Sequence, residues 1–239
     1  MSAATGSVLA MVAALTKMTW PRVRDHLAVG ASTGYMSARR GDWAALVRAA
    51  ADESLSAVEL SALSEPERPG LIDWLDAEPS LPFRWMAAHA PTKARAMPEA
   101  ALVERLAQLA AHVEAVVVHP DVMEDPALYR SLGAKLAIEN MDTRKPVGQR
   151  ADQLQRLFDE LPEARLCFDV AHAGAVDRTM AEGERILEQL GARLSHVHVS
   201  SLDADCHHVP LTEHDEERFS SLLDRCCDVP WILEAPLHR

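Results

Sequence analysis

The chain has 239 residues, of which 48% are hydrophobic and 25% are charged, as in an ordinary globular protein. Its formal net charge of −12 opposes binding to nucleic acid or to an anionic membrane, since such binding depends on lysine and arginine, although a local basic patch stays open. The four cysteines have no CxxC spacing, so we interpret them as reduced thiols in a cytoplasmic protein.

The N-terminal region contains one apolar run, Val8–Leu15, that no basic residue precedes, so it lacks the pattern of a signal peptide. The run is also much shorter than the roughly 20 residues that a membrane-spanning helix needs. We therefore expect residues 1–24 to contribute a helix that packs on the main domain.

From residue 25 onward, short apolar runs rich in valine, isoleucine and leucine alternate with helical patterns. The predicted strands are His26–Ala31, Ala57–Leu63, Phe83–Ala88, Ala115–His119, Lys135–Glu139, Arg165–Asp169, Leu194–Val199 and Trp231–Glu234. The clearest amphipathic segments between them are Pro98–Val113, Gln149–Glu160, Met180–Leu190 and Glu213–Cys226.

This alternation predicts an α/β protein with a parallel sheet, and eight strands in a chain of this length indicate a (β/α)8 TIM barrel that spans residues 1–239 as one domain. The chain continues for only five residues after Glu234, so the eighth helix is expected to be absent. We expect a helix near Val8–Lys17 to fill that gap. An open doubly wound sheet is the rival, which the lack of a glycine-rich βα turn disfavours.

Polar residues follow six consecutive predicted strands, at the ends that share one rim in a barrel. They are His89, His119, Glu139, Asp169 with His172, His198, and Glu234. A carboxylate that ends an apolar strand is costly unless it is paired or bound to metal. The pattern therefore predicts a metal site at this rim.

The stretch Ser195–Leu211 contains four histidines, His198 among them, and two aspartates within seventeen residues. Imidazole and carboxylate at short spacing suit zinc, manganese or iron. We interpret His196, one step deeper than His198, as a structural residue, and His208 as exposed or as a neighbour of the ligands.

These strand ends resemble the xylose isomerase-like TIM barrel superfamily, which includes the AP endonuclease family 2 enzymes of the endonuclease IV type. The resemblance covers roughly residues 26–236. It implies a metal centre of one to three ions, zinc or manganese, with catalytic roles for Glu139 and Glu234. The ligands that it implies are His89, His119, Glu139, Asp169, His172, His198, Asp205, His207 and Glu234.

Two loops are candidates for contacts with a phosphate. One carries Arg39 and Arg40 after the first strand, and the other carries Arg144 and Lys145 after the fifth. The chain departs from the endonucleases in having brief loops and no Gly-x-Gly after the Asp205–His207 motif. With its acidic charge, a small phosphorylated substrate fits better than duplex DNA.

Three functions stay open at this point. The favoured one is a divalent-metal-dependent hydrolase of a phosphoester, an endonuclease IV-like phosphodiesterase, in which the metals activate water. The alternative is a sugar or sugar-phosphate isomerase or epimerase with a single metal, in which Glu139 or Glu234 moves a proton on carbon. The third is a barrel that binds metal or ligand without catalysis.

Overall fold

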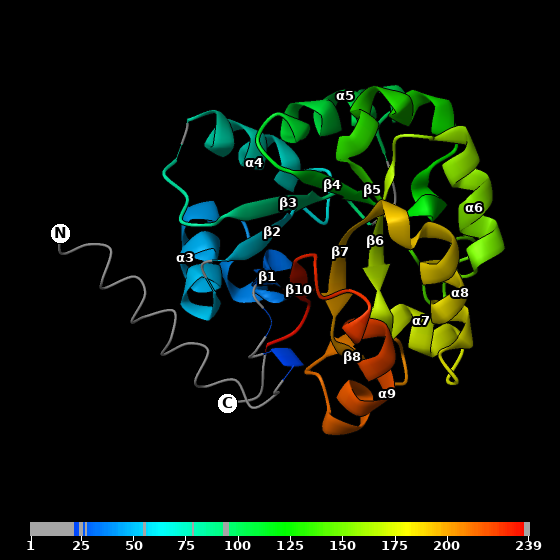
Figure 1. The fold of residues 1–239 in the computed structure, drawn as a ribbon. Helices are drawn as coiled ribbons and strands as arrows, with labels where there is room; N and C mark the ends of the chain where they lie inside the picture. Colours follow the sequence, from blue (N-terminus) through cyan, green and yellow to red (C-terminus); the bar gives the residue numbers. More distant parts are fainter. Residues whose placement is uncertain are drawn as a thin grey trace.

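The fold was analysed in a computed structural model, which describes residues 22–23, 26, 28–54, 56–77, 79–92 and 96–236. Within these ranges, eight parallel strands form a closed barrel in the order β1-β10-β7-β6-β5-β4-β3-β2, and helices surround it (Figure 1). The prediction of a (β/α)8 TIM barrel is confirmed. The predicted helix at Val8–Lys17, and with it most of the segment 1–24, lies outside the described residues.

All eight predicted strands are present, with ends shifted by no more than three residues. Their bounds are β1 Val29–Ser32, β2 Ala57–Ser61, β3 Trp85–His89, β4 Ala115–Val118, β5 Leu136–Glu139, β6 Arg165–Asp169, β7 Leu194–Val199 and β10 Trp231–Leu233. All but β6, which begins at the exposed Arg165, begin with an apolar residue, and each ends at or next to a polar residue of the rim. No helix follows β10 in residues 234–236, the last that are described.

The helices between the strands include the four amphipathic segments predicted from the sequence. The α-helices are α3 Trp43–Glu53, α4 Glu67–Asp76, α5 Glu99–Ala110, α6 Ala151–Glu160, α7 Val170–Val176, α8 Ala181–Leu190 and α9 Glu213–Asp224. Short 3-10 segments are η1 Thr33–Tyr35, η2 Ser37–Arg39, η3 Pro120–Val122, η4 Pro126–Lys135 and η5 Gly191–Arg193. In this part of the chain, no helix is long and apolar enough to cross a lipid bilayer.

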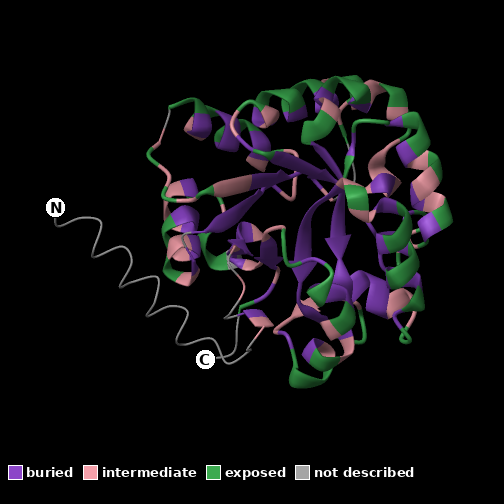
Figure 2. Cartoon of the chain, in the orientation of Figure 1, coloured by how far each residue is buried: buried purple, intermediate pink, exposed green. Residues whose placement is uncertain are grey.

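The main hydrophobic core lies between the barrel and the helices, so the strands are buried while the outer helix faces are exposed (Figure 2). On β4, Val116 and Val118 point outward into this core, whereas Ala115 and Val117 belong to a second cluster of mostly small residues. Side chains alternate along each strand, so every second residue faces the barrel interior. The inward residues nearest the carboxyl ends are therefore brought together, and most of them are polar.

A small antiparallel hairpin follows β7 and was not predicted. Its strands are β8 Ser201–Leu202 and β9 His208–Val209, with Leu202 paired to His208. At its turn, the Asp203 carboxylate accepts hydrogen bonds from the backbone N–H groups of Asp205 and His207. Cys206 there adopts the left-handed conformation, with φ 57°. The hairpin returns the chain toward the rim.

Candidate metal centre

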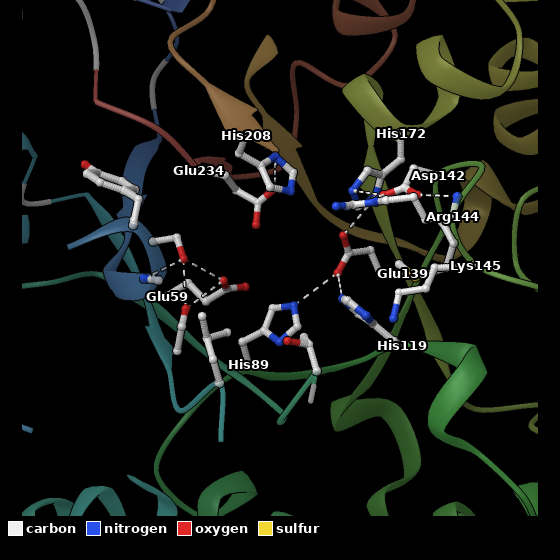
Figure 3. A pocket seen from close by; sticks show the side chains of 17 residues that line it. Glu59, His89, His119, Glu139, Asp142, Arg144, Lys145, His172, His208 and Glu234 are labelled. Atoms are coloured by element: carbon white, nitrogen blue, oxygen red, sulfur yellow. Dashed lines mark hydrogen bonds and ion pairs between the residues drawn. The ribbon is translucent and has the colours of Figure 1, made fainter. Parts of the chain in front are cut away.

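A cavity of about 570 Å³ opens at the carboxyl ends of the barrel strands, where the labelled side chains converge (Figure 3). Its lining comes from loops and strands all around the barrel. The charged and imidazole residues in this lining are Glu59, His89, His119, Glu139, Asp142, Arg144, Lys145, His172, His208 and Glu234. The few acidic and imidazole side chains of the strands are thus concentrated at the carboxyl ends of the barrel.

Four of the predicted ligands form one compact group. Glu139, Asp169, His198 and Glu234 each offer an atom that lies within 4.8 Å of those of the other three. The register of the strands explains part of this, because Asp169 is paired with His198 across β6 and β7. Three carboxylates and one imidazole are a donor set that suits a divalent ion such as magnesium, manganese or zinc.

Three buried atoms without a hydrogen bond indicate that this group fits a cation. Among the described residues, Asp169 Oδ2, His198 Nδ1 and Glu234 Oε2 make no hydrogen bond of good geometry, although an atom of another ionisable side chain lies 3.2–3.4 Å from each. Buried polar atoms are nearly always satisfied, and bound metal is one of the usual reasons for an exception. The residues present therefore fit a divalent ion at this place.

The charges in the cavity point to the same conclusion. Burial raises the pKa of Glu234 well above its ordinary range, and Asp169 and Glu139 raise it further, against the opposing effect of His198. Burial also raises the pKa of Glu139, but His198 and His119 outweigh this effect and bring it well below the ordinary value. A cation among these carboxylates would relieve the repulsion that Glu234 meets.

A second group of possible ligands shares Glu139 with the first. The Nε2 atoms of His89 and His119 both lie 3.2 Å from Glu139 Oε2. These three residues have their ligand atoms within 4.8 Å of one another. Since His89 Nδ1 contacts the Ala90 carbonyl oxygen at 2.8 Å, its Nε2 is the nitrogen that faces the cavity.

His172 belongs to a third group, with Asp169 and His208. Asn140 fixes the start of α7 by accepting from the Asp169 N–H and donating to the Asp169 carbonyl oxygen, both at 2.8 Å. Burial lowers the pKa of His172, but Asp169, followed by Glu139, outweighs it and raises the pKa to about 10. In the protein without metal, His172 is therefore a cation that faces the carboxylates.

Two of the predicted ligands lie away from these groups, at the turn of the β8–β9 hairpin. Asp205 and His207 lie at its turn and are exposed, with the His207 side chain 69% accessible, so neither reaches the cluster. His208 lines the cavity instead, with Nδ1 2.8 Å from Ser200 Oγ and 3.2 Å from Glu234 Oε2. His208 is the first residue of β9 and pairs with Leu202 of β8, whereas His207 still belongs to the turn.

The four basic residues expected at a phosphate also divide into two pairs. Arg40 donates to the Gly34 carbonyl oxygen and to Glu67, which ties the loop after β1 to α4, and neither Arg39 nor Arg40 lines the cavity. Arg144 and Lys145 do line it, but each binds a carboxylate. Arg144 lies 2.6 Å from Asp142 Oδ2, and Lys145 Nζ lies 2.7 Å from Asp121 Oδ2.

Glu59, which was not predicted as a site residue, lines the cavity from β2 and is fully buried. Its signal is an isolated glutamate within the apolar run Ala57–Leu60, a position that only an inward-facing, partnered carboxylate occupies at low cost. His196 is fully buried beneath the cavity, with its ring centre 4.8 Å from that of Trp85. This placement agrees with the structural role predicted for His196.

Neither a protein-family profile nor a curated protein sequence matches this chain. Solved structures do match. 3-Keto-D-glucoside 4-epimerase YcjR from E. coli has a TM-score of 0.54 at 12% identity, over 88% of this chain and 92% of that one. The probable 3-DHS dehydratase AsbF from Bacillus anthracis has a TM-score of 0.52 at 12% identity, over 87% and 91% of the two chains.

A third similar structure is a xylose isomerase-like TIM barrel protein from Mycobacterium smegmatis in complex with magnesium. It has a TM-score of 0.52 at 14% identity and covers 90% of both chains. The chain therefore has the fold of the xylose isomerase-like TIM barrels, as its strand-end motifs predicted. At these identities the similarity establishes the fold, and the reaction has to be argued from the site.

Proposed function

We propose that this protein is a divalent-metal-dependent isomerase or epimerase that acts on a small sugar carrying a carbonyl group. The observation that carries the proposal is the compact group of Glu139, Asp169, His198 and Glu234 beside a cavity of about 570 Å³. Two of its members, Glu139 and Glu234, also line that cavity. Two of the similar structures, a keto-glucoside epimerase and a barrel in complex with magnesium, support the proposal.

A bound ion would hold and polarise adjacent oxygens of the substrate, which makes a proton on the neighbouring carbon more acidic. Glu139 is held by imidazoles at both oxygens, with His89 and His119 at Oε2 and His172 at Oε1, 3.3 Å away. This carboxylate therefore has little freedom to move. The Glu234 side chain is 12% exposed, compared with 1% for Glu139, and faces the cavity more openly.

We infer the roles within the pair from these contacts. Glu234 takes a proton from the substrate carbon or returns it, because it is the more accessible carboxylate. Glu139 orients the surrounding imidazoles. It is also the second carboxylate that isomerisation or inversion at carbon requires. His172 and His208 line the same wall and are placed to donate hydrogen bonds to substrate hydroxyl groups.

Exchange of substrate hydrogen with solvent tests this proposal without knowledge of the product. The purified protein with Mg²⁺ or Mn²⁺ is incubated in D2O with a panel of ketopentoses, ketohexoses and keto-glucosides, and deuterium is followed by NMR. We expect incorporation at a carbon next to the carbonyl group, and its loss in Glu139→Gln and Glu234→Gln. Glu217→Gln, an exposed glutamate on α9, is the matched control. Lack of exchange with every substrate would count against the proposal.

A second candidate, the metal-dependent phosphoester hydrolase, is favoured by one specific observation. The His89–His119–Glu139 and Asp169–His172–His208 groups lie beside the first group and share residues with it, so the cavity offers donors for more than one ion. The exposed Asp205 and His207, and the pairing of Arg144 and Lys145 with carboxylates, weigh against it. These features leave fewer ligands and less free positive charge for a phosphate.

The number of bound ions separates the two candidates. Metal content per chain is measured by inductively coupled plasma mass spectrometry on protein purified without chelators. One equivalent of magnesium or manganese supports the isomerase or epimerase. Two to three equivalents of zinc or manganese, together with hydrolysis of a model phosphodiester, would favour the hydrolase. The cytoplasmic location inferred from the cysteines stays a prediction.

A further inference from the structure

Glu59 is a buried carboxylate to which the proposed reaction gives no role. It lies on β2, faces the barrel interior and contacts β7 across the barrel, at a sequence separation of 139 residues. Its side chain is 0% exposed. A carboxylate in such a place is costly unless its oxygens are engaged by specific partners, so its contacts indicate what it does.

One oxygen of Glu59 is held by two hydroxyl groups. Oε1 accepts hydrogen bonds from Ser32 Oγ at 3.0 Å and from Ser61 Oγ at 3.2 Å, and these two hydroxyl oxygens lie 2.8 Å apart. Ser32 ends β1 and Ser61 ends β2, so both donors sit on rigid strands. The carboxylate is therefore fixed in one orientation, with its second oxygen directed away from the serines.

That second oxygen meets the imidazole of His198. Glu59 Oε2 lies 2.9 Å from His198 Nε2, and the next nearest imidazole nitrogen, His196 Nε2, lies 4.0 Å away. A carboxylate accepts a hydrogen bond and cannot donate one when ionised, so this contact requires the proton of the ring to be on Nε2. In the neutral ring that binds a metal, the other nitrogen of His198 then carries the free electron pair.

The free nitrogen of His198 is the one that faces the candidate metal centre. Nδ1 lies 3.4 Å from both Glu139 Oε1 and Glu234 Oε1, and it has no hydrogen-bond partner within the described part of the chain. An imidazole binds a metal through an unprotonated nitrogen, and the hydrogen bond at the opposite nitrogen selects which one this is. Glu59 therefore stands at the position from which it controls the ligand nitrogen.

We propose that Glu59 is a positioning residue that fixes His198 as a metal ligand through Nδ1, with Ser32 and Ser61 holding Glu59 in place. This inference rests on the proposed function in one respect, namely that His198 holds the ion. Loss of a carboxylate behind a metal-binding histidine lowers metal affinity by roughly 10- to 100-fold in other proteins. The same range is expected for Glu59→Ala.

The test measures Mg²⁺ binding by isothermal titration calorimetry, which does not depend on turnover. We expect Glu59→Ala to raise the dissociation constant by roughly 10- to 100-fold. Glu59→Gln should lose less, since its amide oxygen can still accept from His198 Nε2. Glu217→Gln should bind as the wild type does. Circular dichroism establishes that each variant is folded, and Ser61→Ala, which removes one of the two donors, replaces Glu59→Ala if that variant does not fold.

A second readout separates positioning from general support of the fold. In ¹H–¹⁵N spectra at saturating Mg²⁺, wild-type His198 should carry a single, slowly exchanging proton on Nε2. Loss of Glu59 should make that proton exchange rapidly. Unchanged affinity together with an unchanged His198 signal would overturn the inference. So would the absence of Mg²⁺ binding by the wild type.

The outcomes also distinguish this inference from the proposed function. If the wild type binds Mg²⁺, Glu59→Ala weakens that binding and no carbonyl sugar exchanges hydrogen, then the reaction is wrong and the role of Glu59 holds. If the wild type catalyses exchange and Glu59→Ala binds Mg²⁺ with unchanged affinity, then the proposed reaction holds and the role of Glu59 is wrong.

Discussion

Glu234→Gln is predicted to make the metal-free protein more stable and the metal-bound protein less so. The Glu234 carboxylate lies in the most crowded part of the cavity, with Oε1 3.4 Å from His198 Nδ1 and Oε2 3.2 Å from His208 Nδ1. Burial raises its pKa well above the ordinary value, and the neighbouring carboxylates Asp169 and Glu139 add to this effect while His198 opposes it. Glutamine has the same shape and no charge.

The sign of the pH dependence follows from linkage. The pKa of Glu234 is higher in the folded protein than the value of about 4.3 in the unfolded chain. Its contribution to stability is therefore present below pH 4.3 or so and is lost as pH rises through the folded-state pKa. Glutamine imitates the protonated form at every pH, so the difference between variant and wild type should be near zero at about pH 4.3 and grow toward pH 8.

The size of the stability difference between Glu234→Gln and the wild type follows from the cost of a buried group without adequate partners, which is about 1–3 kcal/mol. Taking about 2 kcal/mol at pH 8, the melting temperature of metal-free Glu234→Gln should exceed that of the wild type by about 4–8 °C in a protein of this size. Mg²⁺ should reverse the order. At a concentration 100 times its dissociation constant it stabilises the wild type by about 2.7 kcal/mol, or about 5–11 °C, whereas the variant has lost one ligand.

The assay is thermal unfolding by circular dichroism between pH 5 and pH 8, with EDTA and then with Mg²⁺. Comparison of the two proteins at each pH cancels the contributions of titratable groups far from Glu234. The carboxylates that repel Glu234, Glu139 among them, do not cancel, so the difference reports this group of carboxylates as a whole. Glu217→Gln is the control for removal of an acidic charge at an exposed site. A metal-free variant that is less stable than the wild type at pH 8, or a difference independent of pH, would refute the reasoning.

Two further predictions concern the barrel and the thiols. A Cβ on Gly30 would lie 2.4 Å from the backbone oxygen of Ala57 on β2. Gly30→Ala should therefore lower stability by about 3 kcal/mol and the melting temperature by about 6–12 °C. The control is Gly191→Ala, which should change stability little because nothing lies within 4 Å of its Cβ. An equally stable Gly30→Ala would contradict the β1–β2 packing. Burial raises the pKa of Cys226 to about 12, so roughly one thiol in 10,000 is ionised at pH 8, compared with about one in four for an ordinary cysteine. Exposed Cys227 and half-buried Cys206 should therefore react with a disulfide reagent at pH 8 before Cys226 does, and replacement of both by serine should abolish that fast phase. Fast labelling of Cys226 would show that its burial is wrong.

The fold could be predicted from the sequence because local patterns carry it. Apolar runs such as Arg165–Asp169 and Leu194–Val199 match β6 and β7 residue for residue, and their regular alternation with helical segments leaves few topologies other than a parallel barrel. The same alternation implies that the polar strand ends share a rim. Glu139, Asp169, His198 and Glu234 could therefore be placed at one rim from the sequence, together with His89, His119 and His172, before any distance between them was known.

The tertiary structure decided which other residues join that group. Asp205, His207 and His208 are adjacent in sequence, and only the return of the β8–β9 hairpin turns His208 toward the cavity while the other two are exposed. Contacts across the barrel are equally invisible in a linear pattern. Glu59 meets His198 over 139 residues of chain because the barrel closes, and closure depends on the pairing of all eight strands at once. Local sequence determines the strands and their polar ends, and the geometry of closure determines which side chains become partners.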